Sequence, residues 1–161
     1  MKPLVSIREA LEDPNLLGTA LEGPTWHSWR SLLIAAMGEP LKPDEMEAFT
    51  KITGRPTPPT QRVDELWCCV GRRGGKSRAM AALATYLAGL CDYSDKLDHG
   101  EKGVVLLLAP DMKQAKVLLD YAEGALESTP LMKQLLVNRT AETLTLTTGS
   151  ALRFAVHPSD A

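Results

Sequence analysis

The sequence predicts an α/β fold in which a parallel sheet is flanked by helices and preceded by a helical N-terminal region. Two runs, Leu66–Val70 and Val104–Ala109, are apolar at every position, which is typical of parallel strands buried on both faces. Each is followed by a helix-forming run, residues 77–90 and 111–126. The order strand, helix, strand, helix predicts a right-handed crossover that brings both strand ends to one edge of the sheet.

Length and composition fit one soluble domain, because 161 residues with 44% apolar side chains suffice for a single core. The 18 basic and 20 acidic residues nearly cancel, so the chain as a whole should not hold nucleic acid, and any DNA contact must be local.

Three cysteines are too few for a disulfide framework, which favours a reducing cytoplasm. Cys68 and Cys69 fall in the first apolar run, where we expect buried thiols. Without a membrane-length apolar run or a leader at Met1, we expect neither membrane insertion nor export.

Three helices are expected in the N-terminal region, residues 1–54. Ser6 and Glu9 have the spacing of a capping box that opens the first helix, which Asp13-Pro14 ends. Thr25 is the expected cap of the second helix, and the third helix is expected to start at Pro43 and stop at Gly54. The side chains expected to face inward from the second and third helices are Trp26, Trp29, Leu32, Leu33, Ala36, Met46, Phe49 and Ile52.

Residues 55–65 are rich in proline, threonine and polar side chains, and they predict a surface linker between the helical region and the sheet. Arg55 and Gln61 lie in this linker. Both are candidates to contact the base of a bound nucleotide, while solvated loop side chains are the commoner case.

A glycine-rich turn, Gly-Arg-Arg-Gly-Gly-Lys-Ser at residues 71–77, separates the first apolar run from its helix. The glycines allow successive N–H groups to point toward one place, which the positive end of the next helix also faces. Lys76 would reach the β- and γ-phosphates of a nucleotide, and the Ser77 hydroxyl would ligate Mg²⁺ and start the helix. The common pattern has glycine where this chain has Val70, so Gly71 comes one residue late. The alternative is a glycine-rich turn with a solvated lysine.

The second half of the chain predicts one loop, one capped helix and one hairpin. Residues 91–103 form a polar loop that is mobile or covers the site, and His99 within it is expected to be solvated. Asp111 and Gln114 have the spacing of a reciprocal helix cap, and they are also candidate site residues at the end of the second strand. The residues expected to form the inward stripe of that helix are Ala115, Leu118, Leu119, Ala122 and Leu126. Residues 143–147 and 151–156, including Phe154 and Val156, predict a hairpin around Thr148-Gly149-Ser150.

Several short motifs together resemble the front end of phage terminase large subunits, the ATPase-nucleases that package viral DNA. The motifs are Trp29-Arg30, Gly38-Glu39-Pro40-Leu41, Thr53-Gly54-Arg55, the turn at residues 71–77, Ala109-Pro110 and Gln114-Ala115. The resemblance covers nearly the whole chain, and its most specific element is a phosphate loop that carries arginines and lacks the first glycine. It implies a P-loop NTPase fold of the RecA/ASCE-like type, incomplete here, with residues 66–161 as a partial ATPase domain.

The resemblance also implies the ligands, the site residues and the partners. The cofactors would be ATP and Mg²⁺, with Lys76 on phosphate, Ser77 on the metal and Arg72 stabilising charge on the transferred phosphate. Lys76 and Arg72 are thus the expected catalytic residues. The expected nucleotide-binding set is Arg72, Arg73, Gly74, Gly75, Lys76, Ser77, Arg78, Arg55 and Gln61. The implied partners are a small terminase subunit, a portal protein and double-stranded DNA, with homo-oligomers in the cytoplasm of a bacterial host infected by a bacteriophage or carrying a prophage.

Three features of that family are not found in the sequence: an apolar strand that ends in adjacent acidic residues, a coupling motif and a nuclease domain. Leu106–Asp111 comes nearest to the acidic strand but contains Pro110 and has no second acid. We therefore expect a fragment that binds ATP with Mg²⁺ and hydrolyses it poorly alone. Two alternatives are another P-loop ATPase or kinase, and a non-catalytic interaction module that docks a small terminase subunit. The module would require an exposed face formed by Trp26, Trp29 and Met46.

Overall fold

The computed structural model describes residues 1–98 and 100–156, with the backbone alone for residues 154–156. His99, the side chains of Phe154 and Val156, and the chain end at Asp160-Ala161 therefore lie outside the described part. The helices are α1 (Ile7–Glu12), the 3-10 helix η1 (Pro24–Trp26), α2 (His27–Ala36), α3 (Pro43–Thr53), α4 (Lys76–Gly89), α5 (Met112–Glu127) and α6 (Pro130–Lys133). The strands are β1 (Lys2–Pro3), β2 (Cys91–Asp92), β3 (Val104–Ala109), β4 (Leu136–Arg139), β5 (Thr143–Leu146) and β6 (Ala151–Val156).

The described strands β3 to β6 form one mixed sheet in the order β3, β6, β5, β4. Only β3 and β6 run parallel, while β5 pairs antiparallel with both β6 and β4. The hairpin predicted around Thr148-Gly149-Ser150 is confirmed by the pairing of β5 with β6. The short strand β4 and the helix α6 were not predicted from the sequence.

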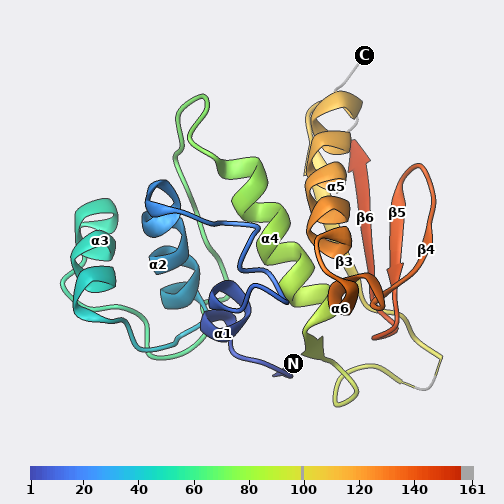
Figure 1. Ribbon diagram of the computed structural model, residues 1–161, viewed down its shortest axis with the longest axis horizontal. Coiled ribbons are helices and arrows are strands. Elements are labelled where there is room, and N and C mark those ends of the chain that lie inside the picture. The colour runs from blue at the N-terminus through green and yellow to red at the C-terminus, as the bar shows by residue number, and fades with distance from the viewer. Residues whose placement is uncertain (99, 157–161) are drawn as a thin grey trace.

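Helices α4 and α5 pack against each other, and α5 covers one face of the sheet in front of β3 and β6 (Figure 1). On the other side of α4 lie α1, α2 and α3, so that α4 stands in the middle of the molecule (Figure 1). The N-terminal helices, α4 and α5 share one buried core, which includes Leu33 of α2, Tyr86 of α4 and Leu119 of α5. None of the helices in residues 1–98 and 100–156 combines the length and the apolar character that a membrane crossing requires.

The N-terminal helices follow the local signals in most details. The Ser6 and Glu9 capping box is present, and α3 begins at Pro43 and ends at Gly54 in the left-handed conformation. Thr25 does not cap α2, because η1 precedes that helix and Trp26 occupies the cap position. Ile52 was expected to face inward, but its side chain is exposed.

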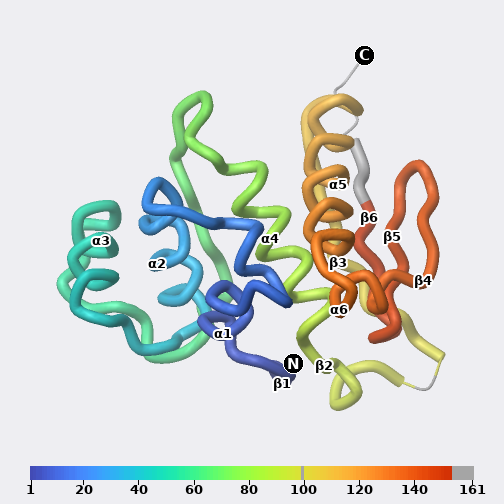
Figure 2. Tube along the Cα trace, in the orientation of Figure 1, coloured from blue at the N-terminus to red at the C-terminus, as the bar shows by residue number. Residues whose placement is uncertain are grey.

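The predicted central strand at Leu66–Val70 is wrong. These residues are not assigned to a strand, and no described strand pairs with them. The Trp67 side chain is 88% exposed, and Cys68 and Cys69 are exposed rather than buried. Figure 2 shows this segment running between α2 and α4, away from the sheet. An apolar run becomes a strand only where a neighbouring strand completes its hydrogen-bond ladder, and none does so here.

Strand β3 has the predicted bounds but is buried on one face only. Leu107 and Ala109 are buried, whereas Val104, Leu106 and Leu108 are 56%, 51% and 57% exposed. Alternate residues of a strand point to opposite faces, and α5 covers just one of them. The sequence pattern could not reveal that the described part of the chain leaves the second face uncovered.

The remaining differences are local. Helix α4 starts at Lys76 rather than at Ser77, with Gly75 as its cap residue. Within the polar stretch at residues 91–103, β2 pairs with β1 at the N-terminus. The inward stripe of α5 is confirmed, with Leu118 half-buried and the other four side chains buried.

Candidate functional site

The glycine-rich turn forms a tight connection into α4. The Gly74 N–H donates to the Gly71 carbonyl over 3.2 Å, and Gly75 has a φ of 78°. A Cβ at Gly74 would stand 2.4 Å from the Val70 Cγ1 atom. A side chain at Gly74 would thus displace the Val70 side chain, and glycine is favoured at Gly75 for conformation.

Arg73 adopts a φ of 62° and is the one non-glycine residue with positive φ in the described ranges 1–98 and 100–156. This left-handed conformation costs a non-glycine residue roughly 1–2 kcal/mol. Alternation of ordinary and left-handed residues is the backbone pattern that turns N–H groups toward an anion.

The first turn of α4 supplies unpaired donors. The helix runs for 14 residues from Lys76, so the N–H groups of its first residues lack partners within the helix. Their positive partial charge adds to that of the whole helix at this end. The turn and the helix start therefore offer several N–H donors to one negatively charged ligand.

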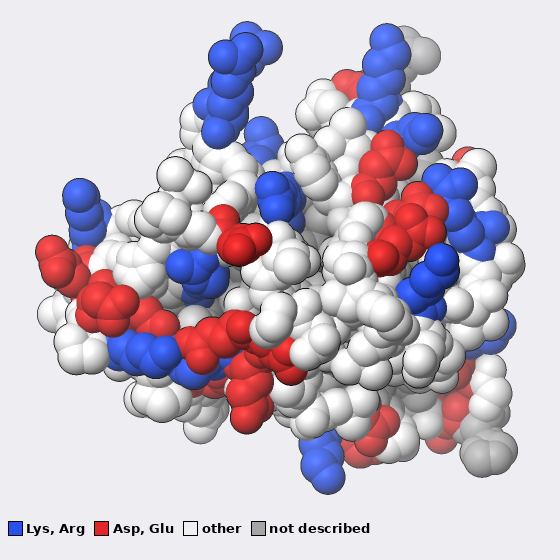
Figure 3. Space-filling view, viewed as in Figure 1, with Lys and Arg blue, Asp and Glu red and all other residues white. Residues whose placement is uncertain are grey.

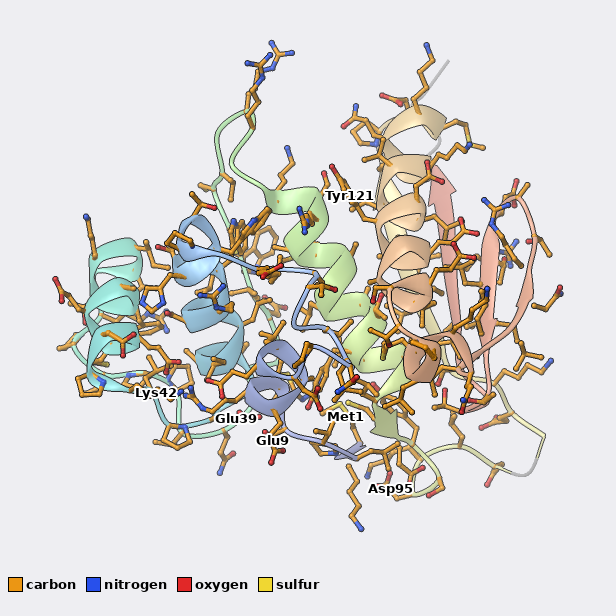
Figure 4. All side chains as sticks on the ribbon, in the orientation of Figure 1. Met1, Glu9, Glu39, Lys42, Asp95 and Tyr121 are labelled. Atoms are coloured by element: carbon orange, nitrogen blue, oxygen red, sulfur yellow. The ribbon has the colours of Figure 1, made fainter. Side chains whose placement is uncertain are left out.

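A cavity of about 320 Å³ lies at this turn. Its lining comprises Trp26, Gly71, Arg73, Gly74, Gly75, Lys76, Ser77, Arg78, Val117 and Tyr121. The N-terminal region thus forms one wall and α5 forms the other; in Figure 4 the labelled Tyr121 side chain lies between α5 and α4. The volume lies at the lower end of the range for small-molecule sites.

The lining of this cavity contains cations and no carboxylate. Arg73, Lys76 and Arg78 contribute positive charge, and the structure records no ion pair for Lys76 within the described part of the chain. Figure 3 shows Lys and Arg side chains projecting from the top of the molecule, where the chain turns into α4. The local field therefore favours an anion although the net charge of the chain is −2.

The arginines predicted to bind nucleotide have different surroundings. Arg72 is exposed and is not part of the cavity lining, whereas Arg73 is. Arg78 donates to the carbonyls of Ala20 at 2.5 Å and Thr19 at 3.1 Å. Its guanidinium also lies 5.1 Å from the Trp26 ring centre, a cation–π distance. Arg78 thus ties α4 to the N-terminal region while it lines the cavity.

Two tryptophans of the N-terminal region contact the turn directly, which sequence reasoning missed. The Trp29 Nε1–H donates to the Gly74 carbonyl over 2.8 Å, although the two residues are 45 positions apart. The Trp26 ring lies against Gly75. Both side chains were assigned to the core from their helical spacing. No periodic signal connects positions so distant, so the sequence could not identify these contacts.

A second, larger groove of about 610 Å³ also reaches the turn, at Gly74. It is bordered by Trp29 and Phe49, by Leu66–Val70 and by Arg55. Gln61 is not in the lining of this groove. Its backbone packs against Gly38, where an added Cβ would stand 2.3 Å from the Gln61 carbonyl carbon. Of the two linker candidates, the fold therefore brings Arg55 beside the turn and leaves Gln61 outside both cavities.

Asp111 and Gln114 act as a helix cap. The Asp111 carboxylate accepts from the Gln114 backbone N–H at 2.9 Å and from its Nε2 at 2.6 Å. The Gln114 side chain thus bonds the carboxylate and not the Asp111 backbone, so the predicted reciprocal cap is only half formed. These bonds, the backbone N–H first, hold the pKa of Asp111 below its ordinary value. Neither residue lines either cavity.

The residues at the turn fit a magnesium–phosphate group better than a metal ion alone. Within residues 1–98 and 100–156, no group of three or more His, Cys, Asp or Glu side chains could hold a metal. Mg²⁺ commonly keeps several waters and takes few protein ligands when phosphate oxygens supply the rest. Ser77 is the side chain of the cavity lining suited to that part.

No protein-family model matches the chain, and neither a curated protein nor a solved structure matches it. The turn, its cavity and the two tryptophans are therefore the features on which a functional assignment depends.

Proposed function

We propose that this chain binds ATP with Mg²⁺ through the turn at residues 71–77, as the ATP-binding N-terminal part of a phage terminase large subunit. The observation that supports ATP binding is the cavity at the start of α4, which combines unpaired helix N–H groups with cations and contains no carboxylate in its lining. The terminase assignment rests on the motif resemblance.

Each residue has a distinct role in this proposal. The N–H groups of Gly75 and Lys76 hold the phosphates, and the Lys76 ammonium neutralises the β- and γ-oxygens. Ser77 ligates Mg²⁺, and Arg72 or Arg73 stabilises charge on the transferred phosphate. Arg55 borders the neighbouring groove, where it is available to the base.

Hydrolysis by this chain alone should be slow. Phosphoryl transfer to water needs a group that orients the attacking water, and carboxylates commonly do this together with the metal. The cavity lining includes neither an acidic nor a histidine side chain. ATP-Mg²⁺ should therefore bind without efficient turnover. Packaging activity, with a small terminase subunit, a portal protein, double-stranded DNA and homo-oligomers in the host cytoplasm, is proposed for a complete motor.

The alternative of an interaction module draws little support from the tryptophan face. Trp26, Trp29 and Met46 are only partly exposed, and both tryptophans contact the turn. A kinase or another P-loop ATPase uses the same phosphate chemistry. Transfer of labelled phosphate from ATP to a nucleoside or metabolite would favour that alternative.

The test is a titration of the chain with labelled ATP in the presence of Mg²⁺. Lys76→Ala should weaken binding by about tenfold or more, since it removes a charged contact worth roughly 1.5–3 kcal/mol. Lys51→Ala is the matched control, because Lys51 is an exposed lysine in the last turn of α3. Equal affinities of the unmodified chain and Lys76→Ala would refute the proposal.

A further inference from the structure

The hydrogen bond from Trp29 to Gly74 fixes one peptide group of the turn. An indole has a single N–H donor, and Trp29 directs it to the Gly74 carbonyl at 2.8 Å. Trp29 belongs to α2, which Leu33 and Ile34 anchor in the core. The donor is therefore held by a packed helix, and the carbonyl has a fixed partner.

The orientation of that carbonyl determines where the next N–H points. The described part of the chain contains no cis peptide bond, and in a trans peptide the C=O and N–H point in opposite directions. Because the Gly74 carbonyl faces Trp29, which borders the larger groove, the Gly75 N–H points away from Trp29. Gly75 itself lines the smaller cavity at the start of α4. The indole thus directs one amide donor toward the cavity side of the turn.

The adjacent residue, Gly75, lies close to both tryptophans. A Cβ on Gly75 would stand 2.7 Å from Trp26 Cζ3 and 3.3 Å from Trp29 Nε1. Arg78 covers the Trp26 ring at 5.1 Å and is itself held by the Ala20 carbonyl. Two tryptophans from the N-terminal region therefore support two successive glycines of the turn.

We propose that Trp29 is a positioning residue for phosphate binding, which acts through the Gly74 carbonyl on the orientation of the Gly75 N–H. This inference rests on the proposed nucleotide site and adds a role for the N-terminal helical region: that region completes the phosphate site. A ligand that binds the turn should in return alter the surroundings of the Trp29 indole, because the two are joined by one hydrogen bond.

Inorganic pyrophosphate is the appropriate ligand for the test, since it occupies a phosphate site without requiring a base pocket. Trp29→Phe retains an aromatic ring and removes the donor. It should weaken pyrophosphate binding by about three- to tenfold, the value of one hydrogen bond, in calorimetric titrations. Trp67→Phe is the matched control: the Trp67 indole also donates a hydrogen bond, to Glu65 at 2.9 Å, but its side chain is 88% exposed and lies outside the small cavity.

A spectroscopic measurement on the unmodified chain separates positioning from a purely structural role. The three tryptophans give three indole N–H signals in a ¹⁵N correlation spectrum. Trp67→Phe and Trp26→Phe assign two of them, and the third belongs to Trp29. Pyrophosphate should shift the Trp29 signal and leave the Trp67 signal in place. This measurement remains informative even if Trp29→Phe does not fold.

The outcomes distinguish this inference from the proposed function. Absence of pyrophosphate binding by the unmodified chain would overturn both. Normal binding with an unmoved Trp29 signal, or with undiminished affinity in folded Trp29→Phe, would overturn the positioning role alone. Weakened binding in folded Trp29→Phe together with a shifted Trp29 signal would support it.

Discussion

The Trp26 ring lies so close to Gly75 that a Cβ at this glycine would stand 2.7 Å from the ring. Gly75 also has a φ of 78°, which side-chain-bearing residues rarely adopt. Conformation and close approach therefore both require glycine at the start of α4. The contact also connects the N-terminal helices to the turn, so a substitution that moves one region should also affect the conformation of the other.

Substitution of Gly75 by alanine should separate these two requirements. Gly75→Ala should lower the free energy of unfolding by about 2–4 kcal/mol, from left-handed strain plus the clash with Trp26. Gly54→Ala is the control, because Gly54 has a φ of 69° and nothing within 4 Å of an added Cβ. It should lose only about 1 kcal/mol. Urea unfolding measures both, and equal losses would contradict the close contact with Trp26.

Arg73 should be strained at its φ of 62°. Arg73→Gly should raise the free energy of unfolding by up to about 1 kcal/mol, since relief of the left-handed strain outweighs the greater freedom of glycine in the unfolded chain. The neighbouring Arg72→Gly lacks this relief and should lower stability by about 0.5 kcal/mol. Thermal unfolding of the two variants tests the backbone conformation, and a loss of stability in Arg73→Gly would argue against it.

Arg8 and Glu45 form a bidentate ion pair between α1 and α3, with N–O distances of 2.6 and 2.8 Å. The hydrogen bonds from Arg8 are the largest cause that lowers the pKa of Glu45 below its ordinary 4.5. The stabilising contribution is thus complete above about pH 5 and is lost as the pH falls through the lowered pKa of the folded state. Glu45→Gln should lower the free energy of unfolding by about 2 kcal/mol at neutral pH.

The pH dependence provides the check on this pair. Between about pH 6 and pH 3, the unmodified chain should lose more stability than Glu45→Gln, because the variant has no carboxylate to protonate. Glu12→Gln is the control: the half-exposed Glu12 carboxylate pairs with Lys42 at 2.7 Å and, more weakly, with Arg8 at 3.6 Å, and its loss should change stability by less than about 1 kcal/mol. Equal pH slopes for Glu45→Gln and the unmodified chain would exclude a lowered pKa.

Adjacent leucines of β3 should differ in their contributions to stability. Leu107 is buried, whereas Leu106 is 51% exposed on the uncovered face. Leu107→Ala should cost about 2–4 kcal/mol, and Leu106→Ala less than about 1 kcal/mol. Guanidinium unfolding of the two variants compares the same chemical change on opposite faces. Similar losses would show that both faces of β3 are covered in solution.

The three cysteines should react at different rates with a thiol reagent. Cys68 and Cys69 are exposed, while Cys91 is buried and burial raises its pKa to about 11. Thiolate is the reacting form, so two thiols should react in the native chain and the third only after unfolding. Cys68→Ser and Cys69→Ser should each remove one fast equivalent. If neither Cys68 nor Cys69 reacted in the native chain, the segment Leu66–Val70 would be buried, as the sequence predicted.

Local patterns in the sequence determined most of the elements. The Ser6 capping box, the start of α3 at Pro43, its stop at Gly54 and the bounds of β3 depend on residues within a few positions of each other. Such signals are complete in the sequence because the groups that satisfy each other are neighbours in the chain. The same holds for the glycine-rich turn that feeds α4.

Only the tertiary structure decided what lies beside each element. Leu66–Val70 has the composition of a strand, but pairing requires a second strand whose position no local pattern states, and no strand among residues 1–98 and 100–156 pairs with the segment. Trp29 has the spacing of a core residue, yet its indole donates to Gly74, 45 positions away. Contacts over such separations depend on how whole helices pack, and for that reason the support of the turn by the N-terminal region was not predictable from the sequence.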